Sequence, residues 1–511
     1  MMQGREKSDP AIGAEKPANE AAQAAEEPAE QRAGAKGNAQ EPATRRVQDR
    51  GSVTQGLERI RQAARQRKEE KFTSLLHHVN LALLHESFYA LKRDASPGVD
   101  GRTWRDYEQV LERNLEDLRD RVHRGGPYHP LPSRRSYIPK ADGRRRPLAI
   151  AALEDKIVQR AALQVMSAIY EEDFLGFSYG FREGRSQHDA LDALSAAIIT
   201  RKVNFVVDAD IRSFFDEVSQ EWLIRFLERR IGDKRILRLI QKWLKAGVLE
   251  DGMVTVSERG TGQGAVISPL LANVYLHYVI DLWAEHWRRH EAKGDMIIVR
   301  YADDLVLGFE HEAEARRFLD AMRRRLEAFA LSLHPEKTRI IEFGRHAARN
   351  RHERGLGKPE TFNFLGFTFI CGTKRRGGFL LKRKSRADRM RAKLKELKDQ
   401  LRRRVHEPIE EVGRWLGQVV RGYFNYHAVP TNSASLATFR WRVLTLWRRT
   451  LKRRGNRDRT TLNDIVALAN QYLPRALVQH PWPEQRFAVK HPRWEPYAGK
   501  PHVRFCAGGA Q

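Results

Sequence analysis

The segment MIIVRYADDLVLGF, residues 296–309, constrains the fold more than any other part of the sequence. Its two ends are apolar runs that favour β-strands, and Asp303 and Asp304 stand side by side at the turn between them. Adjacent carboxylates repel each other, and a tight turn favours glycine or asparagine, so the pair carries a cost that a bound cation would reverse. Mg²⁺ prefers oxygen ligands of this kind, together with substrate phosphates. The segment therefore predicts a β-hairpin that presents two carboxylates to a metal ion.

A second acidic segment, FVVDADIRSFFDEV at 205–218, supplies a partner for that hairpin. Residues 205–207 favour a strand, and its far end carries Asp208, Asp210 and Asp216. The chain between the two segments is long enough for a helix and its connections. Two strand ends that carry carboxylates can hold two metal ions for phosphoryl transfer, in which one ion activates a 3′-hydroxyl and the other steadies the leaving pyrophosphate.

A glycine-rich stretch lies between the two acidic segments. Glycines at positions 260, 262 and 264 precede Ser268, Pro269 and an apolar run. Glycine allows close backbone approach, and proline is well placed in the first turn of a helix. The stretch therefore predicts a loop followed by a buried helix. The chain contains no Gly-x4-Gly-Lys-Ser/Thr pattern, which excludes a P-loop.

The charge balance favours a polyanionic partner. The chain of 511 residues has 92 Lys+Arg against 65 Asp+Glu, which gives a formal net charge of +27. Residues 371–455 alone hold 24 basic and six acidic residues, interleaved with aromatic residues such as Trp415 and Trp441. Basic surfaces with stacking side chains suit nucleic acid. No apolar run approaches the roughly 20 residues that span a bilayer. The two cysteines, Cys371 and Cys506, exclude a disulfide framework and a cysteine-rich zinc module.

Composition and periodicity divide the chain into parts. Residues 1–55 are predicted to be a disordered tail, because the first 50 are rich in Ala, Glu, Pro and Gly and carry net charge −1. Helical apolar spacing follows from residue 56, and SPGVDG at 96–101 interrupts it. The segment 136–150 predicts a hairpin, and 371–455 predicts three amphipathic helices with a basic face. No targeting signal is predicted at the start.

Three motifs taken together resemble those of reverse transcriptases. They are DIRSFFD (210–216), GTGQGAVISPLLANVYLH (260–277) and YADD (301–304), in this order and spacing. More narrowly, the chain resembles the group II intron-encoded reverse transcriptase/maturase proteins of bacteria. The further matching segments are SPGVDG (96–101), IPKADGRRRPLAI (138–150), FSYGFREGRSQHDAL (177–191), LHPEKTRI (333–340), FLGF (364–367) and RGYFNY (421–426). The resemblance covers residues 56–505 approximately.

This resemblance implies a right-hand polymerase of α/β (α+β) class, with an antiparallel palm sheet and an all-helical thumb. Residues 56–125 would be a helical N-terminal extension of the fingers, and 126–370 the reverse transcriptase fingers and palm. Residues 371–455 would form the thumb, or X maturase domain, and 456–511 a basic C-terminal segment without an endonuclease.

Two departures from the family pattern stand out. Many relatives have proline and glycine where this chain has Gly262 and Ala265, and these small residues can keep the path of the loop without the rigidity of proline. The chain ends at HVRFCAGGAQ, without the paired cysteines and histidines of the endonuclease that many relatives carry. The resemblance therefore implies the class that does not cut its own DNA target.

The resemblance also implies the catalytic residues. Asp210, Asp303 and Asp304 would be the catalytic carboxylates and would bind two Mg²⁺ ions. Lys337 would lie near the pyrophosphate as a candidate proton donor.

Four other residues would contact the incoming deoxynucleotide. Lys140 and Arg146, on the fingers hairpin, would hold the triphosphate, a role for which an ammonium and a bidentate guanidinium are suited. Phe215 would be a steric gate, because a large ring under the sugar clashes with a 2′-hydroxyl. Gln263 would line the nucleotide pocket.

The implied function is twofold: RNA-directed DNA synthesis, and binding of the chain's own group II intron RNA to promote splicing and mobility by target-primed reverse transcription. The implied partners are that intron RNA, an RNA template with a DNA primer or target DNA, and deoxynucleotides. The implied location is the bacterial cytoplasm, on nucleic acid and without a membrane. Three alternatives remain open. They are a reverse transcriptase of another class (retron, diversity-generating or CRISPR-associated), a splicing factor with a decayed polymerase site, and an RNA-dependent RNA polymerase, which Phe215 disfavours.

Overall fold

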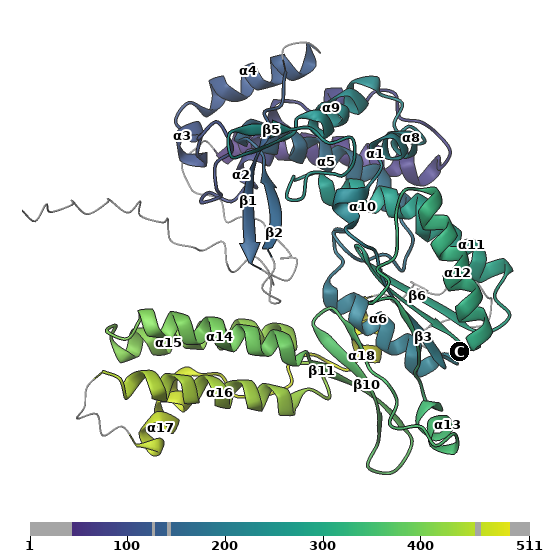
Figure 1. Ribbon diagram of the computed structural model, residues 1–511. Helices are drawn as coiled ribbons and strands as arrows, with labels where there is room; N and C mark the ends of the chain where they lie inside the picture. The colour runs from purple at the N-terminus through teal and green to yellow at the C-terminus, as the bar shows by residue number, and fades with distance from the viewer. Residues whose placement is uncertain (1–42, 125–127, 140–144, 455–460, 491–511) are drawn as a thin grey trace, which may run out of the picture.

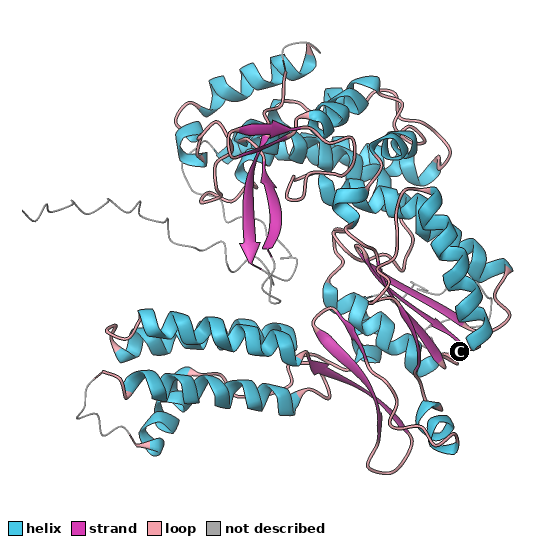
Figure 2. Ribbon diagram, viewed as in Figure 1, coloured by secondary structure: helices cyan, strands magenta, loops and turns pink. Residues whose placement is uncertain are grey.

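The computed structural model describes residues 43–124, 128–139, 145–454 and 461–490, and a four-stranded antiparallel sheet lies at the heart of its palm (Figures 1 and 2). The strand order is β6 (Met296–Tyr301), β7 (Asp304–Phe309), β3 (Phe205–Asp210) and β8 (Arg339–Glu342). The predicted hairpin at 296–309 is the β6–β7 pair, and β7 also pairs with β3. The predicted antiparallel palm sheet is thereby confirmed.

Both faces of this sheet are covered, which explains why most residues of its central strands β6, β7 and β3 are apolar. One face, with Val207 and Leu305, joins the largest apolar core. The other face, with Val206 and Val306, packs against α6. The helices of the palm are α6 (Gln187–Thr200), α7 (Phe214–Glu217), α10 (Ser268–Leu276), the π-helical turn η3 (His277–Asp281), α11 (Leu282–His290) and α12 (Glu312–Ala328).

The predicted glycine-rich loop and buried helix are present. Helix α10 begins at Ser268 with Pro269 in its first turn, as the sequence indicated. Helix α6 begins at a capping box in which Ser186 and Asp189 satisfy each other's backbone amides.

The fingers combine a second sheet with the N-terminal helices (Figure 1). The predicted hairpin at 136–150 is the antiparallel pair β1–β2, whose turn, including Lys140, lies outside the described residues. The strands are β2 (Arg145–Ile150), β1 (Ser133–Pro139), β4 (Val248–Glu250) and β5 (Met253–Thr255), in spatial order. The helices are α1 (Ala43–Gln66), η2 (Leu76–His78), α2 (Leu81–Tyr89), α3 (Trp104–Glu108), α4 (Leu111–His123), α5 (Leu153–Asp173), α8 (Gln220–Leu227) and α9 (Lys234–Lys245).

A third sheet leads from the palm into the thumb. Its strands are β9 (Phe362–Phe364), β10 (Phe367–Thr373) and β11 (Phe379–Ser385), and α13 (Ala347–Glu353) precedes them. Two of the sequence motifs meet at this junction, since the Tyr426 hydroxyl donates to the Leu365 carbonyl at 2.7 Å. Phe424 is fully buried, and Tyr423 stacks on Phe439 with ring centroids 3.7 Å apart, so both pack between helices.

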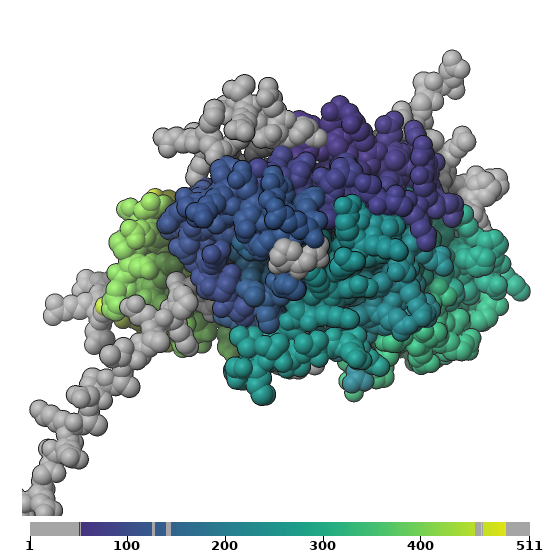
Figure 3. Space-filling model, turned by 90° about the horizontal axis from the view of Figure 1, so that it is seen from above, coloured from purple at the N-terminus to yellow at the C-terminus, as the bar shows by residue number. Residues whose placement is uncertain are grey.

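Three long helices form the thumb, as predicted: α14 (Ala387–Arg403), α15 (Ile409–His427) and α16 (Ser433–Leu451). Helix α17 (Leu462–Tyr472) joins the same apolar core through Ile465 and Ala469. The last described helix, α18 (Pro483–Lys490), returns to the palm and contacts α6. Seen from above, the light-green thumb helices project beyond the purple and blue N-terminal elements (Figure 3).

Three predicted boundaries need correction. Helix α1 begins at Ala43 rather than after residue 55, and its residues Val53, Ile60 and Ala64 are buried in the main core. The hairpin β10–β11 crosses the predicted boundary at 370/371, since Phe367 pairs with Ser385. The thumb core extends beyond residue 455 because α17 packs into it. Among the described residues, no helix is long and apolar enough to span a membrane.

Candidate active site

Two carboxylates face each other at one end of the palm sheet. Asp210 ends β3, Asp304 begins β7, and the two residues are directly paired in the antiparallel register. Asp303 precedes Asp304 in the turn of the β6–β7 hairpin. The structure thus brings together all three acids to which the sequence assigned metal binding. Asp216 lies farther on, exposed in α7.

The electrostatics of these acids favour a bound cation. Burial raises the pKa of the Asp303 carboxyl, and the negative charge of Asp210 raises it further. The pKa of Asp304 is also raised, by desolvation and by the charges of Asp303 and Asp210, and because Asp304 itself is exposed, we attribute the rise mainly to those two charges. A divalent ion would reverse this mutual repulsion, because it stabilises the ionised form of every carboxylate around it.

The Lys337 ammonium group takes the place of such a cation beside Asp210. Its Nζ atom lies 2.5 Å from the Asp210 Oδ2 atom. Within the described ranges, no three acidic, histidine or cysteine side chains stand close enough to hold a metal ion as they are placed. The three carboxylates are nevertheless hard oxygen donors at adjoining positions, so their chemistry fits a divalent ion once Asp210 turns from Lys337.

Phe215 lies directly after the strand that carries Asp210. Ser213 adopts a left-handed backbone with φ of 42°, which starts the short helix α7. Phe214 is buried in the core, whereas Phe215 is only partly covered. The glycine-rich loop packs closely on this helix, because the Thr261 amide donates to the Phe215 carbonyl at 2.9 Å and a Cβ at Gly260 would lie 2.9 Å from that oxygen.

The same loop also contacts the fingers hairpin. The Ala149 amide on β2 donates to the Gln263 carbonyl at 2.6 Å. Arg146, on the same strand, is exposed, and its positive charge opposes the rise in the pKa of Asp303. Arg146 and Gln263 therefore belong to elements that border the carboxylates, and Lys140 lies outside the described residues.

The sequence reasoning missed two arginines near these acids. Arg300 is fully buried in β6, directly before Tyr301 of the YADD motif. Arg389, on thumb helix α14, opposes the rise in the pKa of Asp304. A charged residue inside the otherwise apolar run MIIVRY was the available signal for Arg300. No comparable signal marks Arg389 within a segment that is basic throughout.

Comparison with known proteins shows to which family the chain belongs. A model of the reverse transcriptase (RNA-dependent DNA polymerase) family matches residues 138–369. The chain is 38% identical over 279 residues to protein YkfC of Escherichia coli strain K12, a match that covers 48% of this chain and 72% of that protein. The chain belongs to the reverse transcriptase family. Nucleic acid partners and a divalent metal ion are general features of reverse transcriptases.

Intron-encoded proteins are among the relatives of this reverse transcriptase. The group II intron-encoded protein LtrA of Lactococcus lactis subsp. cremoris is 34% identical over 227 residues, which are 43% of this chain and 37% of LtrA. An uncharacterized 91 kDa protein in the cob intron of Schizosaccharomyces pombe is 27% identical over 400 residues, which are 65% of this chain and 47% of that protein. The narrower resemblance to intron-encoded reverse transcriptases is thereby confirmed, although these matches cover less than half of either relative.

Proposed function

We propose that this chain is an RNA-directed DNA polymerase that extends a DNA primer on an RNA template with deoxynucleotides and two Mg²⁺ ions. We further propose that it binds its own group II intron RNA in the bacterial cytoplasm, promotes splicing, and serves intron mobility by target-primed reverse transcription. The observation that carries the polymerase half is the direct pairing of Asp210 with Asp304, beside Asp303, at one end of the palm sheet.

In this proposal, Asp210, Asp303 and Asp304 hold the metal ions. When bound, these ions activate the 3′-hydroxyl of the primer and stabilise the charge that develops on the leaving pyrophosphate. The carboxylates themselves supply the negative field, and the strand pairing of Asp210 with Asp304 keeps their backbones in register, while the Asp210 side chain turns from Lys337 toward the ion. Lys337 gives the leaving pyrophosphate a proton, a role that its pairing with the catalytic Asp210 supports.

The remaining proposed roles concern the nucleotide. Lys140 and Arg146 hold the triphosphate from the fingers side, and Gln263 lines the pocket. Phe215 excludes ribonucleotides, a role that its partial exposure beside the Asp210 strand supports. The basic thumb, with 24 Lys and Arg between residues 371 and 455, contacts the nucleic acid backbone and the intron RNA.

Primer extension on an RNA template tests the polymerase half. Asp303→Ala should lower the extension rate by about a thousandfold or more, as removal of a charged catalytic group does. Asp320→Ala removes an exposed acid of α12 and serves as the matched control with little effect. Equal activity of the wild-type protein and Asp303→Ala would overturn the assignment of the site.

A splicing assay at low Mg²⁺, with RNA transcribed from the region that flanks the gene, tests the maturase half. Both the wild-type protein and Asp303→Ala should accelerate splicing, because RNA binding does not need the carboxylates. If neither accelerates splicing while the wild-type protein extends a primer, the chain is a reverse transcriptase with another task.

A further inference from the structure

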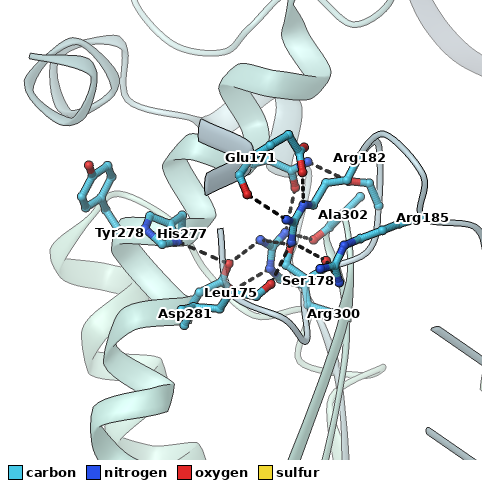
Figure 4. Close-up of polar contacts among 12 residues, drawn as sticks. Glu171, Leu175, Ser178, Arg182, Arg185, His277, Tyr278, Asp281, Arg300 and Ala302 are labelled. Carbon is cyan, nitrogen blue, oxygen red and sulfur yellow. Dashed lines mark hydrogen bonds and ion pairs between the residues drawn. The ribbon is translucent and has the colours of Figure 1, made fainter. Parts of the chain in front are cut away.

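Arg300 is a fully buried arginine in the middle of the palm, and each nitrogen of its guanidinium group donates hydrogen bonds to identified acceptors. Its Nε and Nη2 atoms donate to the two carboxylate oxygens of Asp281 at 2.7 and 2.5 Å (Figure 4). Neither side chain of this pair has any exposed surface. An apolar residue at position 300 would continue the apolar pattern of β6, so the strand itself gives no reason for an arginine.

The remaining donors of Arg300 reach the turn that carries Asp303. Nη1 donates to the Ala302 carbonyl oxygen and to the Asn273 side-chain oxygen, both at 3.0 Å. Nη2 also donates to the Ser178 hydroxyl oxygen at 2.7 Å. One guanidinium group therefore connects β6, η3, α10 and the loop before α6 to the backbone of the YADD turn.

This turn needs such support, because Ala302 has a left-handed backbone with φ of 55°. That conformation is unfavourable for a residue with a Cβ atom and persists only where the surroundings enforce it. The loop 177–180 packs directly on the turn: a Cβ at Gly180 would collide with the Ala302 backbone nitrogen. The Asn273 side-chain amide fixes this loop by donating to the Gly180 carbonyl at 2.7 Å.

A second buried arginine holds the same loop from its other side. Arg182 Nη1 donates to the Leu175 and Ser178 carbonyls at 2.8 and 2.9 Å, and its Nε pairs with Glu171 at 2.9 Å (Figure 4). The strand β6 is also bonded to this loop through the Arg300 backbone, which donates to the Phe177 carbonyl and accepts from the Tyr179 amide. The loop beneath the turn is therefore held by hydrogen bonds from both Arg182 and the backbone of Arg300.

We propose that Arg300 and Asp281 are positioning residues that hold the Ala302–Asp303 turn in the geometry needed to bind the divalent ion. This inference rests on the proposed polymerase function. A buried ion pair alone does not require it, since such pairs often add little stability relative to apolar packing. The bond from Arg300 to the Ala302 carbonyl is the feature that an apolar pair could not supply.

Titration of Mn²⁺ into the full-length protein with primer and template, followed by electron paramagnetic resonance, tests this role without relying on activity. Wild-type protein and Asp303→Ala define the signal of the site. Arg300→Lys keeps the charge but cannot reach all the acceptors, and should weaken Mn²⁺ binding by about tenfold or more, as loss of supporting hydrogen bonds does at metal sites. Asn273→Ala keeps the ion pair but removes one acceptor of Nη1 and the bond to the Gly180 carbonyl, so it should give a smaller loss in the same direction even if Arg300→Lys fails to fold.

Arg230→Lys is the matched control. Arg230 is also buried, pairs with Asp173 at 2.8 Å and donates to backbone carbonyls at the end of α1, far along the chain from the YADD turn. It should lower the melting temperature without changing Mn²⁺ affinity. Unchanged Mn²⁺ affinity in Arg300→Lys and Asn273→Ala, with a loss of melting temperature alone, would overturn the positioning role. If the wild-type protein binds Mn²⁺ at Asp303 but extends no primer, the proposed polymerase function fails, while the Mn²⁺ titration still decides this inference.

Discussion

The Lys337 ammonium group lies 2.5 Å from the Asp210 carboxylate, at the end of the palm sheet where Asp210 is paired with Asp304. In the proposed site, a divalent ion would therefore compete with Lys337 for the same oxygen. Lys337→Met should lower the Mn²⁺ concentration needed for half-saturation severalfold, because Asp210 no longer has an internal counter-ion. Without metal, the same variant should lose only about 0.5 kcal/mol of stability, since Lys337 is largely exposed.

Electron paramagnetic resonance for Mn²⁺ and thermal unfolding in EDTA check these two effects. Lys358→Met, in the loop after α13, is a suitable control for the loss of one positive charge. Weaker Mn²⁺ binding by Lys337→Met would show that Lys337 supports the metal site instead of competing with the ion.

Phe215→Ala should relax the choice of sugar. The partly exposed ring of Phe215 follows the Asp210 strand, so its removal should lower the preference for deoxynucleotides over ribonucleotides by about tenfold to a hundredfold, the range of steric discrimination. Phe214→Leu changes the buried neighbouring ring instead and should cost about 1 kcal/mol of stability with no change in sugar preference. Single-nucleotide incorporation with matched deoxy- and ribonucleotides measures the ratio, and an unchanged preference in Phe215→Ala would remove Phe215 from its proposed role.

Gly180→Ala should disrupt the YADD turn from the loop side. The new Cβ would collide with the Ala302 nitrogen and lie 2.9 Å from the Tyr301 carbonyl carbon, so either the loop or the turn must move. We expect a loss of about 3 kcal/mol, as for overpacking against a rigid backbone, together with strongly reduced primer extension.

Gly184→Ala is the matched control in the same loop. Gly184 has φ of 71°, but a Cβ there would meet nothing within 4 Å, so only backbone strain of about 1 kcal/mol is expected. Denaturant unfolding and primer extension separate the two variants. Equal effects of both substitutions would contradict the close packing of Gly180 on the turn.

His188 should make the palm sensitive to acid. Both of its ring nitrogens are buried and find no hydrogen-bond partner among the residues that the structure describes, and its ring stacks on His480 with centroids 4.2 Å apart. Desolvation first, and then the charges of His480, Arg486 and Arg383, lower the pKa of His188 to about 2. In the unfolded chain the imidazole binds a proton below pH 6.5, whereas in the folded chain it does not, so stability is lost as the pH falls through that value.

His188→Phe keeps an aromatic ring and removes the titrating group. Between pH 7.5 and pH 5, the wild-type protein should lose about 2 kcal/mol more unfolding free energy than the variant. Denaturant unfolding across this range measures it. A constant difference over the range would mean that His188 is protonated in the folded protein.

Much of the palm could be predicted because its strands carry their signal locally. The runs that form β6, β7 and β3 are short and mostly apolar, as buried strands are, and the acids Asp210, Asp303 and Asp304 lie at the same end of the sheet. When these strands pair, the carboxylates at their ends come to lie next to each other. The loop and helix around Ser268 were equally predictable, since glycine and proline act through their own backbone.

The support of the YADD turn could not be predicted in the same way. The partners of Arg300 come from Ser178, Asn273 and Asp281, and the chain between Ser178 and Arg300 spans 122 positions. No local pattern links them, and Asp281 lies in a π-helical turn that the sequence does not mark. The boundary of the thumb was misplaced for a related reason: β11 and the turn before it have the basic composition of the helices that follow, although β11 pairs with the apolar strand β10.

The return of α18 to the palm has a consequence for synthesis of the protein in the cell. Helix α18 contacts α6, and Arg486 pairs with Asp192 at 3.2 Å. Helix α6 is therefore synthesised almost 300 residues before the helix that packs against it. Until then, Arg383 is the partner that Asp192 has among the described residues already made, and part of the α6 surface stays uncovered. Contacts between residues so far apart in the sequence form slowly, and the intermediates expose apolar surface that favours aggregation. We therefore expect the nascent chain to bind chaperones until α18 has been made.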